Sequence, residues 1–259
     1  MNTALIFYLI LFGGLATMLL DGWGWVAWGV YLFVMPVGAL AVRRATLHSW
    51  PAVLRPVTRQ PLGRAVLAAV LAAALVLVLF ALLSLTGWVE AEGHGVNLRT
   101  LFTGVLGPQL LVACWEELTF RGALQPITIR HLGQKAGLMV ASALFGLFHL
   151  PNILHHEVPA ALIPQTVAAL ILMGAIFGLA ALRDGGYLAL PIALHFGWNG
   201  ACFGLEEVFS YRFVGPPWLT GTAAWFPESG LLGAATLMVL AGISRWLTGP
   251  RVQSAQAEV

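Results

Sequence analysis

Charged residues are scarce in this sequence of 259 residues, where Asp, Glu, Lys and Arg together make up only 9%. A soluble globular domain carries about 25% charged residues. Hydrophobic residues make up 59% of the chain, which is more apolar side chain than a soluble fold of this length can bury. The composition therefore excludes a soluble protein and predicts a polytopic membrane protein.

Cysteine and lysine are also rare. Cys114 and Cys202 both lie inside apolar segments, so we expect buried thiols and no disulfide framework. Lys135 is the only lysine, and there is no basic run or basic helix face, which argues against nucleic acid as a partner. The first apolar run lacks the preceding basic residues of a cleaved signal peptide, so we expect the chain to keep it.

Long apolar runs, by contrast, are abundant. A spanning helix needs about 20 mostly apolar residues. The runs predict an all-α fold of about eight spans in a single integral membrane domain, residues 1–259, with a disordered tail at 250–259. The expected spans are residues 4–20, 24–42, 64–88, 101–131 (starting near Leu101 or Pro108), 136–150, 160–182, 187–205 and 229–247.

Basic residues near the span ends predict the orientation, because they favour the cytoplasmic side of a membrane. Five arginines lie between the second and third spans, and threading eight spans from that loop puts both termini in the cytoplasm. Only Arg99 and Arg212 then fall outside. Twelve of the thirteen basic residues are arginine, which favours a prokaryotic source and hence the prokaryotic cytoplasmic membrane.

Away from the span ends, five ionisable residues remain at membrane depth: Glu116, Glu117, Arg121, His149 and His195. A central charge costs about 2.5 to 3.5 kcal/mol on insertion scales, so such residues usually face the helix bundle and mark function. Glu117 and Arg121 are four residues apart on one helix face, where Arg121 could pair with Glu117 and keep it ionised. Glu116 is turned about 100° away and is free to face another helix.

The polar residues are expected at one depth. Glu116 is 14 residues from Arg130, His149 is 14 from Lys135, and His195 is 12 from Arg183. At about 1.5 Å per residue, all three lie about 18 to 21 Å above the inner boundary. That level is in the outer half of a hydrocarbon core about 30 Å thick. The spacing therefore predicts one buried site formed by three helices.

The residue types suit hydrolysis. A carboxylate and an imidazole, such as Glu116 and His149, can hold and deprotonate a water. His195 and Asn199 share one face of the seventh span and could donate hydrogen bonds to a developing oxyanion. The same residues leave a second possibility open, because Glu116, His149 and His195 could bind zinc with a free position for water.

Other patterns of intramembrane hydrolases are missing. The sequence has no HExxH motif and no Gly-x-Ser-x-Gly elbow. Paired membrane aspartates are excluded, because Asp21 and Asp184 are the only aspartates and both lie at span ends.

Three segments resemble the motifs of a known family. "EELTFR" (116–121), "FGLFH" (145–149) and "HFGWN" (195–199) resemble the EExxxR, FxxxH and HxxxN/D motifs of the CAAX-protease and bacteriocin-processing (CPBP) membrane family. All three occur in the family's order on separate predicted spans, within residues 101–205. The resemblance implies an eight-helix α fold and hydrolysis of a peptide bond in a membrane-anchored protein or peptide.

The resemblance also implies roles for these residues. It implies Glu116 and His149 as the groups that activate water, His195 and Asn199 as the oxyanion site, and Glu117 with Arg121 in support. Family members have been described both as metalloproteases and as glutamate proteases, so zinc stays an alternative. Eukaryotic members trim prenylated CAAX termini at the cytosolic face. The depth of this site leads us instead to expect cleavage near the extracytoplasmic boundary.

Two other functions are considered. A proton-coupled transporter also uses buried Glu, His and Arg, but we find no inverted repeat and no pair of broken helices. A non-catalytic membrane scaffold or immunity protein could have kept the motifs for shape alone.

Overall fold

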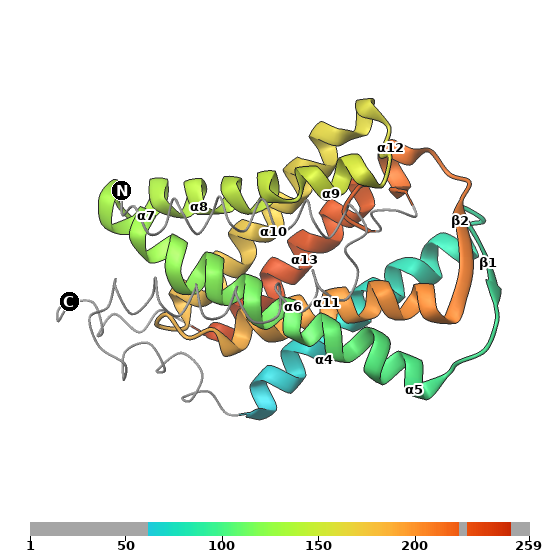
Figure 1. Ribbon diagram of the computed structural model, residues 1–259, viewed down its shortest axis with the longest axis horizontal. Coiled ribbons are helices and arrows are strands. Elements are labelled where there is room, and N and C mark those ends of the chain that lie inside the picture. The colour runs from blue at the N-terminus through green and yellow to red at the C-terminus, as the bar shows by residue number, and fades with distance from the viewer. Residues whose placement is uncertain (1–61, 223–226, 250–259) are drawn as a thin grey trace.

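A computed structural model describes residues 62–222 and 227–249, which form a bundle of helices (Figure 1). The predicted spans at 4–20 and 24–42 and the predicted tail at 250–259 lie outside the described residues. Five helical segments are long and apolar enough to cross a membrane: Leu62–Leu85, Leu98–Leu132, Gln134–His155, Ala160–Arg183 and Leu231–Thr248. They confirm a helical membrane fold, while the total of about eight spans stays a prediction.

The long helical segments alternate in direction along the chain (Figure 1). Their bounds are α4 (Leu62–Leu85), α5 (Leu98–Thr100), α6 (Gly107–Glu117), α7 (Gln125–Leu132), α8 (Gln134–Phe148), α9 (Leu150–His155), α10 (Ile163–Arg183), α11 (Ala189–Val208), α12 (Pro217–Thr220) and α13 (Leu231–Thr248), with the π-helical segments η1 (Leu101–Leu106) and η2 (Leu118–Leu124) and the 3-10 turn η3 (Ala160–Leu162). The last turns of α4, α9 and α11 share one end of the bundle with α12, whereas the α7–α8 turn lies at the opposite end (Figure 1).

The fourth span is a continuous helical segment of 35 residues that runs from α5 to α7. It starts before both of the predicted starts, Leu101 and Pro108, because the helix continues through Pro108. At the end of η1, the amide of Gly107 donates to the carbonyl of Phe102, five residues earlier. Pro108 follows in the first turn of α6, where its missing N–H is tolerated. A second π-helical segment, η2, follows Glu117 directly.

The fifth span also continues past its predicted end. The span was expected to end at residue 150, but Pro151 stands in the first turn of α9, which extends to His155. Proline suits that position, because its fixed φ matches a helix and it needs no hydrogen-bond acceptor there. His149 lies between the two helices with φ −82° and ψ −5°.

A two-stranded antiparallel sheet was not part of the predicted all-α fold. β1 (Val89–Gly93) pairs with β2 (Phe209–Phe213), so that Val89 lies opposite Phe213. The strands follow α4 and α11, whose last turns lie at the same end of the bundle (Figure 1). Phe80 of α4 packs on the sheet, with ring centroids 5.6 Å from Phe209 and 5.2 Å from Tyr211. Aromatic packing of this kind stabilises short strands.

α11 packs closely against α4. A Cβ atom on Gly197 would lie only 2.1 Å from the carbonyl oxygen of Ala69, so only glycine permits this approach. α11 is largely buried and is not among the five segments that qualify as spans by composition. A helix enclosed by others need not be apolar on every face, because it does not face lipid.

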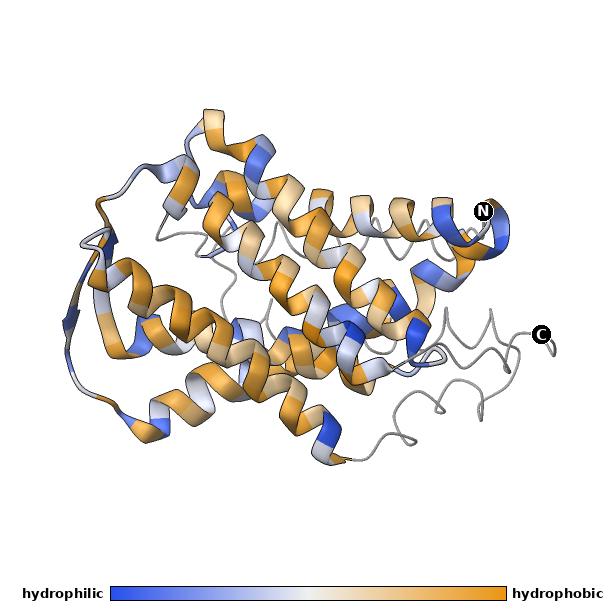
Figure 2. Ribbon diagram, turned by 180° about the vertical axis from the view of Figure 1, so that it is seen from behind, coloured by the Kyte–Doolittle hydropathy of each residue, from blue (hydrophilic) through white to orange (hydrophobic). Residues whose placement is uncertain are grey.

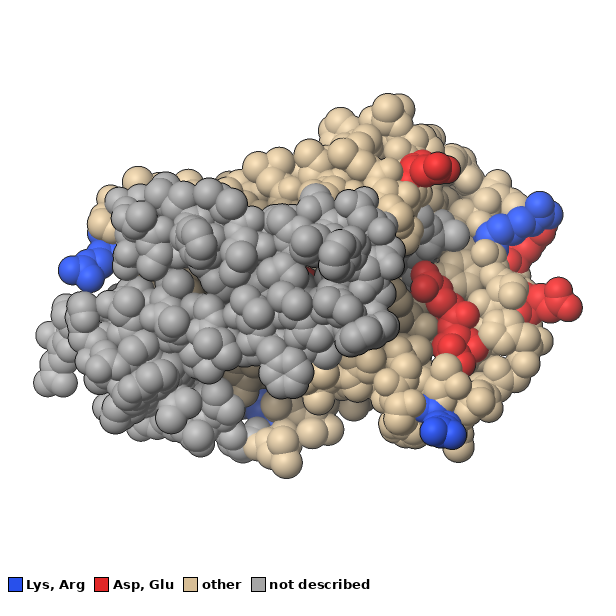
Figure 3. All heavy atoms as spheres, in the orientation of Figure 1, with Lys and Arg blue, Asp and Glu red and all other residues tan. Residues whose placement is uncertain are grey.

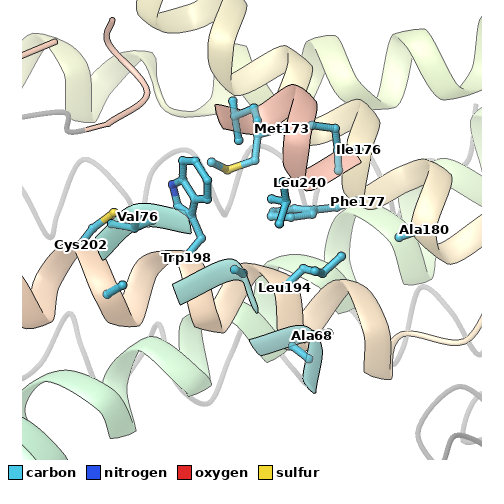
Figure 4. Close-up of a cluster of buried hydrophobic side chains, with 14 of the residues drawn as sticks. Ala68, Val76, Met173, Ile176, Phe177, Ala180, Leu194, Trp198, Cys202 and Leu240 are labelled. Carbon is cyan, nitrogen blue, oxygen red and sulfur yellow. The ribbon is translucent and has the colours of Figure 1, made fainter. Parts of the chain in front are cut away.

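The core lies between α4, α10, α11 and α13. Figure 4 shows Trp198 and Leu194 of α11 directed toward Met173 and Phe177 of α10, with Leu240 of α13 beside them. All five side chains are buried. This packing holds α11, which carries the third motif, in a fixed position within the bundle.

Polar residues gather at the ends of the bundle. Figure 2 shows apolar residues along the middle of the helices and hydrophilic residues at the α7–α8 turn and in the strands. On the face in Figure 3, the acidic side chains concentrate at the end that carries β1 and β2, while basic side chains occur at both ends. This distribution suits a membrane-spanning bundle, and the predicted orientation of its ends stays a prediction.

Candidate active site

Three helical segments bring Glu116, His149 and His195 together. Glu116 is the penultimate residue of α6, His149 lies between α8 and α9, and His195 is in the second turn of α11. The Oε2 atom of Glu116 is 3.8 Å from His149 Nε2 and 4.0 Å from His195 Nε2. Glu116 Oε2 is buried and accepts no hydrogen bond from the described residues. Two imidazole nitrogens therefore face one carboxylate oxygen at distances slightly too long for direct hydrogen bonds.

Next to these three residues lies an ion pair between Glu117 and Arg121, which was predicted from their spacing on one helix. Arg121 Nη1 donates to Glu117 Oε1 at 2.9 Å, and both side chains are almost completely buried. The same oxygen also accepts from His195 Nδ1 at 2.9 Å. Glu117 thus connects a permanent positive charge to the imidazole that faces Glu116. A buried charge that is paired and hydrogen-bonded in this way is stable in an apolar interior.

Arg121 is also fixed to the neighbouring helix α10. Its Nη2 atom donates to the carbonyl of Gly174 at 3.0 Å, and one turn later Gln125 Nε2 donates to the carbonyl of Gly178 at 3.1 Å. The two glycines form a Gly-x-x-x-Gly pattern, which allows close approach of another helix. The guanidinium carbon of Arg121 lies 4.3 Å from the ring centroid of Phe145, a cation–π contact. These contacts were not predicted from the sequence, although the Gly-x-x-x-Gly pattern in α10 was a usable signal.

The hydrogen bonds of the two histidines determine which ring nitrogen carries the proton. His149 Nδ1 lies 2.8 Å from the carbonyl of Phe145, which can only accept, so Nδ1 is the donor. His195 Nδ1 likewise donates to the carboxylate of Glu117. In the neutral form of each ring, Nε2 then carries the lone pair. Both Nε2 atoms face Glu116, so each ring offers an acceptor there when it is neutral and a donor when both of its nitrogens are protonated.

Asn199 lies one turn beyond His195 on α11, as the i,i+4 spacing predicted. Its side-chain Nδ2 donates to Gln109 Oε1 on α6 at 3.3 Å. Asn199 and Gln109 are only partly buried, whereas Glu117 and Arg121 are almost completely buried. The site is therefore closed on the side of Glu117 and Arg121. It is more open on the side of Asn199 and Gln109, toward the end of the bundle that carries β1 and β2.

The predicted depth of the site requires correction at His195. The estimate counted 12 residues of straight helix from Arg183, but α10 ends at Arg183 and α11 begins only at Ala189. His195 therefore lies about 9 Å from the start of its helix. His149 lies about 22 Å from the start of α8 at Gln134. The helices meet at one site without beginning at one level, so the count from Arg183 overestimated the depth of His195.

The fit of a zinc ion can be tested on the same distances. In the described part of the chain, no group of three His, Cys, Asp or Glu side chains is spaced to hold a metal ion. Ligand atoms bound to tetrahedral zinc at about 2.0 to 2.1 Å lie about 3.3 Å apart. The separations of 3.8 and 4.0 Å around Glu116 are wider than this. The donor types suit zinc, but the described spacing does not.

Glu228 lies just before the expected span at 229–247, where a solvated loop charge is expected, but the structure buries its side chain. Glu228 is only 6% exposed, and the indole Nε1 of Trp198 donates a hydrogen bond to its Oε1 atom. Burial raises the pKa of this carboxyl to about 7. Gln165 of α10 donates to the carbonyl of Ser229 and holds the turn in place. No spacing in the sequence indicated this buried carboxylate, because it belongs to a turn and not to a helix face.

Comparison with known proteins identifies the segment that contains the site. Residues 98–201 match a family model described as type II CAAX prenyl endopeptidase Rce1-like. This stretch includes all three motifs, and the match confirms the family that they indicate. Comparisons with curated proteins and with solved structures found no match. Together with the five candidate spans, the match supports a CAAX-type protease in a membrane.

Proposed function

Since residues 98–201 belong to the Rce1-like family of type II CAAX prenyl endopeptidases, we propose that this protein is an intramembrane endopeptidase. It hydrolyses a peptide bond of a membrane-anchored protein or peptide, with water activated by Glu116. The observation that carries the proposal is the convergence of His149 Nε2 and His195 Nε2 on Glu116 Oε2, at 3.8 and 4.0 Å. Three ionisable side chains from separate helices meet there inside an apolar bundle, where their burial is costly and usually marks function.

The distances suit a bridging water. A water oxygen about 2.8 Å from Glu116 Oε2 can also reach His149 Nε2, because the two atoms are 3.8 Å apart. The water donates one hydrogen to the carboxylate and keeps a lone pair for the substrate. The low dielectric of the interior strengthens these contacts. Glu116 removes the proton as the water oxygen attacks the carbonyl carbon.

His195 and Asn199 stabilise the oxyanion that forms. Since His195 Nδ1–H is bonded to Glu117, a proton on Nε2 makes the ring an imidazolium, whose charge Glu117 balances. The Nε2–H then donates to the oxyanion, together with an N–H of the Asn199 amide. Glu117 and Arg121 act through His195: they orient the ring without touching the substrate.

The proton on Glu116 completes the reaction. When the tetrahedral intermediate collapses, the C–N bond breaks and Glu116 returns the proton to the leaving nitrogen. A carboxylic acid and a free amine are released, and the carboxylate is regenerated. One group therefore acts first as base and then as acid, as microscopic reversibility allows.

We also propose that the substrate reaches the site from the extracytoplasmic side. Support comes from the half-buried side chains of Gln109 and Asn199, which lie toward the end of the bundle with β1 and β2. The opposite end carries Arg64, Arg130, Lys135, Arg183 and Arg245. Basic residues favour the cytoplasm. In this proposal the protein lies in the cytoplasmic membrane of a prokaryote, with both termini inside.

The experiment compares purified wild-type protein with Glu116→Gln on a library of quenched fluorescent peptides that each contain one apolar transmembrane segment. Glu92→Gln is the matched control, because Glu92 is exposed in β1. We expect cleavage by wild type and the control, and loss of at least 100-fold in Glu116→Gln.

A chelator arm distinguishes the catalytic types. Cleavage that survives chelation supports a glutamate-activated water, whereas loss that zinc restores means a metalloprotease. Equal cleavage by Glu116→Gln and wild type would overturn the proposed role of Glu116. If the wild type cleaves no peptide and mediates proton-dependent uptake in vesicles, the protein is a transporter.

A further inference from the structure

Gln109 contacts Asn199, whose side-chain amide can point in two opposite directions. The Asn199 amide has an acceptor oxygen at one end and a donor nitrogen at the other, and only the nitrogen can stabilise an oxyanion. The structure shows Asn199 Nδ2 donating to Gln109 Oε1 at 3.3 Å. The two residues are 90 positions apart in the chain, on α6 and α11.

The helix geometry places Gln109 in line with the site. Gln109 precedes Glu116 by seven residues, about two helical turns, so both lie on the same face of α6. That face meets α11 at two levels, where Glu116 faces His195 and Gln109 faces Asn199.

Close packing keeps α6 and α11 together at the level of Gln109 and Asn199. A Cβ atom on Gly200 would lie 3.3 Å from Leu106 Cδ2, at the end of η1. The glycine next to Asn199 therefore lets the start of α6 approach α11. The π turn that ends at Gly107, followed by Pro108, sets the rotation of α6 just before Gln109. π-helical turns occur often at functional sites, where they reorient side chains.

We propose that Gln109 is a positioning residue that holds the Asn199 amide with its nitrogen toward the reacting carbonyl. This inference rests on the proposed function. Gln109 Oε1 takes one hydrogen of the Asn199 amide and leaves the second for the oxyanion. A reversed Asn199 amide would set its oxygen against Gln109 Oε1, where two acceptors repel, so reversal requires both amides to turn together. The reversed amide would also present an acceptor to the oxyanion, which destabilises the transition state.

The test is the kinetics of Gln109→Met in the full-length protein. Methionine has a similar length and cannot form the hydrogen bond. The probe is the transmembrane peptide from the fluorogenic library that wild type cleaves fastest. Removing one oxyanion donor outright lowers kcat about 10²- to 10³-fold. Losing only its orientation should lower kcat less, by about tenfold, with KM unchanged.

Leu111→Met is the matched control, because Leu111 is exposed on the same helix. Its kinetics should equal those of wild type. Thermal unfolding is measured for each variant, and Gln109→Leu replaces Gln109→Met if the latter is unstable.

A double-mutant cycle separates positioning from direct binding. In the Asn199→Ala background, Gln109→Met should change kcat by less than about twofold, because there is no amide left to orient. An unchanged kcat for Gln109→Met in the wild-type background overturns the inference. So does a rise in KM, or an equal fall in both backgrounds. Cleavage by wild type that does not depend on Glu116 is a failure of the proposed function and not of this inference.

Discussion

His195 Nδ1 donates to Glu117 Oε1 at 2.9 Å, and the exposed fractions of the two residues are only 2% and 0%. The contact joins the third motif to the first across the bundle. Because the same oxygen also accepts from Arg121, one carboxylate stabilises two cationic or potentially cationic groups. Glu117 is therefore central to the stability of the site as well as to the orientation of its imidazole.

Replacing Glu117 should destabilise the fold. Glu117→Gln leaves the Arg121 guanidinium buried without a counter-charge, which costs about 3 to 5 kcal/mol. The change can be followed by intrinsic fluorescence during thermal unfolding, since the chain has ten Trp. The double variant Glu117→Gln/Arg121→Met removes both charges and should recover part of the loss. A double variant less stable than either single one would contradict the electrostatic explanation.

Two glycines of α11 should differ in their tolerance of alanine. At Gly197 the added Cβ would lie 2.1 Å from the backbone oxygen of Ala69, and at Gly200 it would lie 3.3 Å from a side-chain atom of Leu106. Because α4 must move as a whole to accept the first, Gly197→Ala should lower stability by about 2 kcal/mol or more. Gly200→Ala should lower it by less than about 1 kcal/mol. Comparable melting temperatures for the two variants would show that α4 and α11 are less tightly packed than described.

Stability should depend on pH through Glu228. Burial raises the pKa of its carboxyl from the ordinary glutamate value of 4.5 to about 7. The protonated carboxyl is favoured in the folded state, so its contribution is fully present below about pH 4.5 and is lost as the pH rises through about 7. The total effect is on the order of 3 kcal/mol.

Glu228→Gln removes this titration and keeps an acceptor for the Trp198 indole. Between pH 5 and pH 8, the melting temperature of wild type should therefore fall more steeply than that of the variant. Parallel curves would mean that Glu228 does not titrate in this range.

The proposed orientation can be tested with single cysteines at opposite ends of the bundle. Glu92 lies in β1 and Lys135 at the start of α8, and both are exposed. In intact bacterial cells, a membrane-impermeant maleimide should label Glu92→Cys, whereas Lys135→Cys should react only after permeabilisation. The reverse pattern would invert the orientation, and the proposed extracytoplasmic entry would then be wrong.

The sequence predicted the local relationships well. Residues four apart on one helix, such as Glu117 and Arg121, are neighbours because of the local helix geometry alone. The structure has their side chains in contact. The meeting of Glu116, His149 and His195 was predicted from their similar depth in three spans, although the depth counted for His195 was too great. Their placement agrees with that prediction, and their catalytic roles stay proposals.

Contacts that depend on irregular backbone could not be predicted. The η1 and η2 segments break the 3.6-residue period on which helix-face arguments depend, so neither was foreseen. Gln109 lacks the charge that drew attention to Glu116, and its partner is 90 residues away. Glu228 lies outside the expected span at 229–247, where the sequence gives no reason to expect burial. Only tertiary folding shows that its turn packs against Trp198.

The pairing of Glu117 and Arg121 within one helix has a consequence for biosynthesis. A chain enters the membrane from its N-terminus, so the segment that holds these residues inserts before α8, α10 and α11 have been made. The ion pair needs no other helix and can form as soon as its own turn forms, which lowers the penalty of insertion. Glu116 has no such partner on its helix and meets His149 and His195 only later. Arg121 can thus neutralise Glu117 during membrane insertion, before the helices that complete the site have been synthesised.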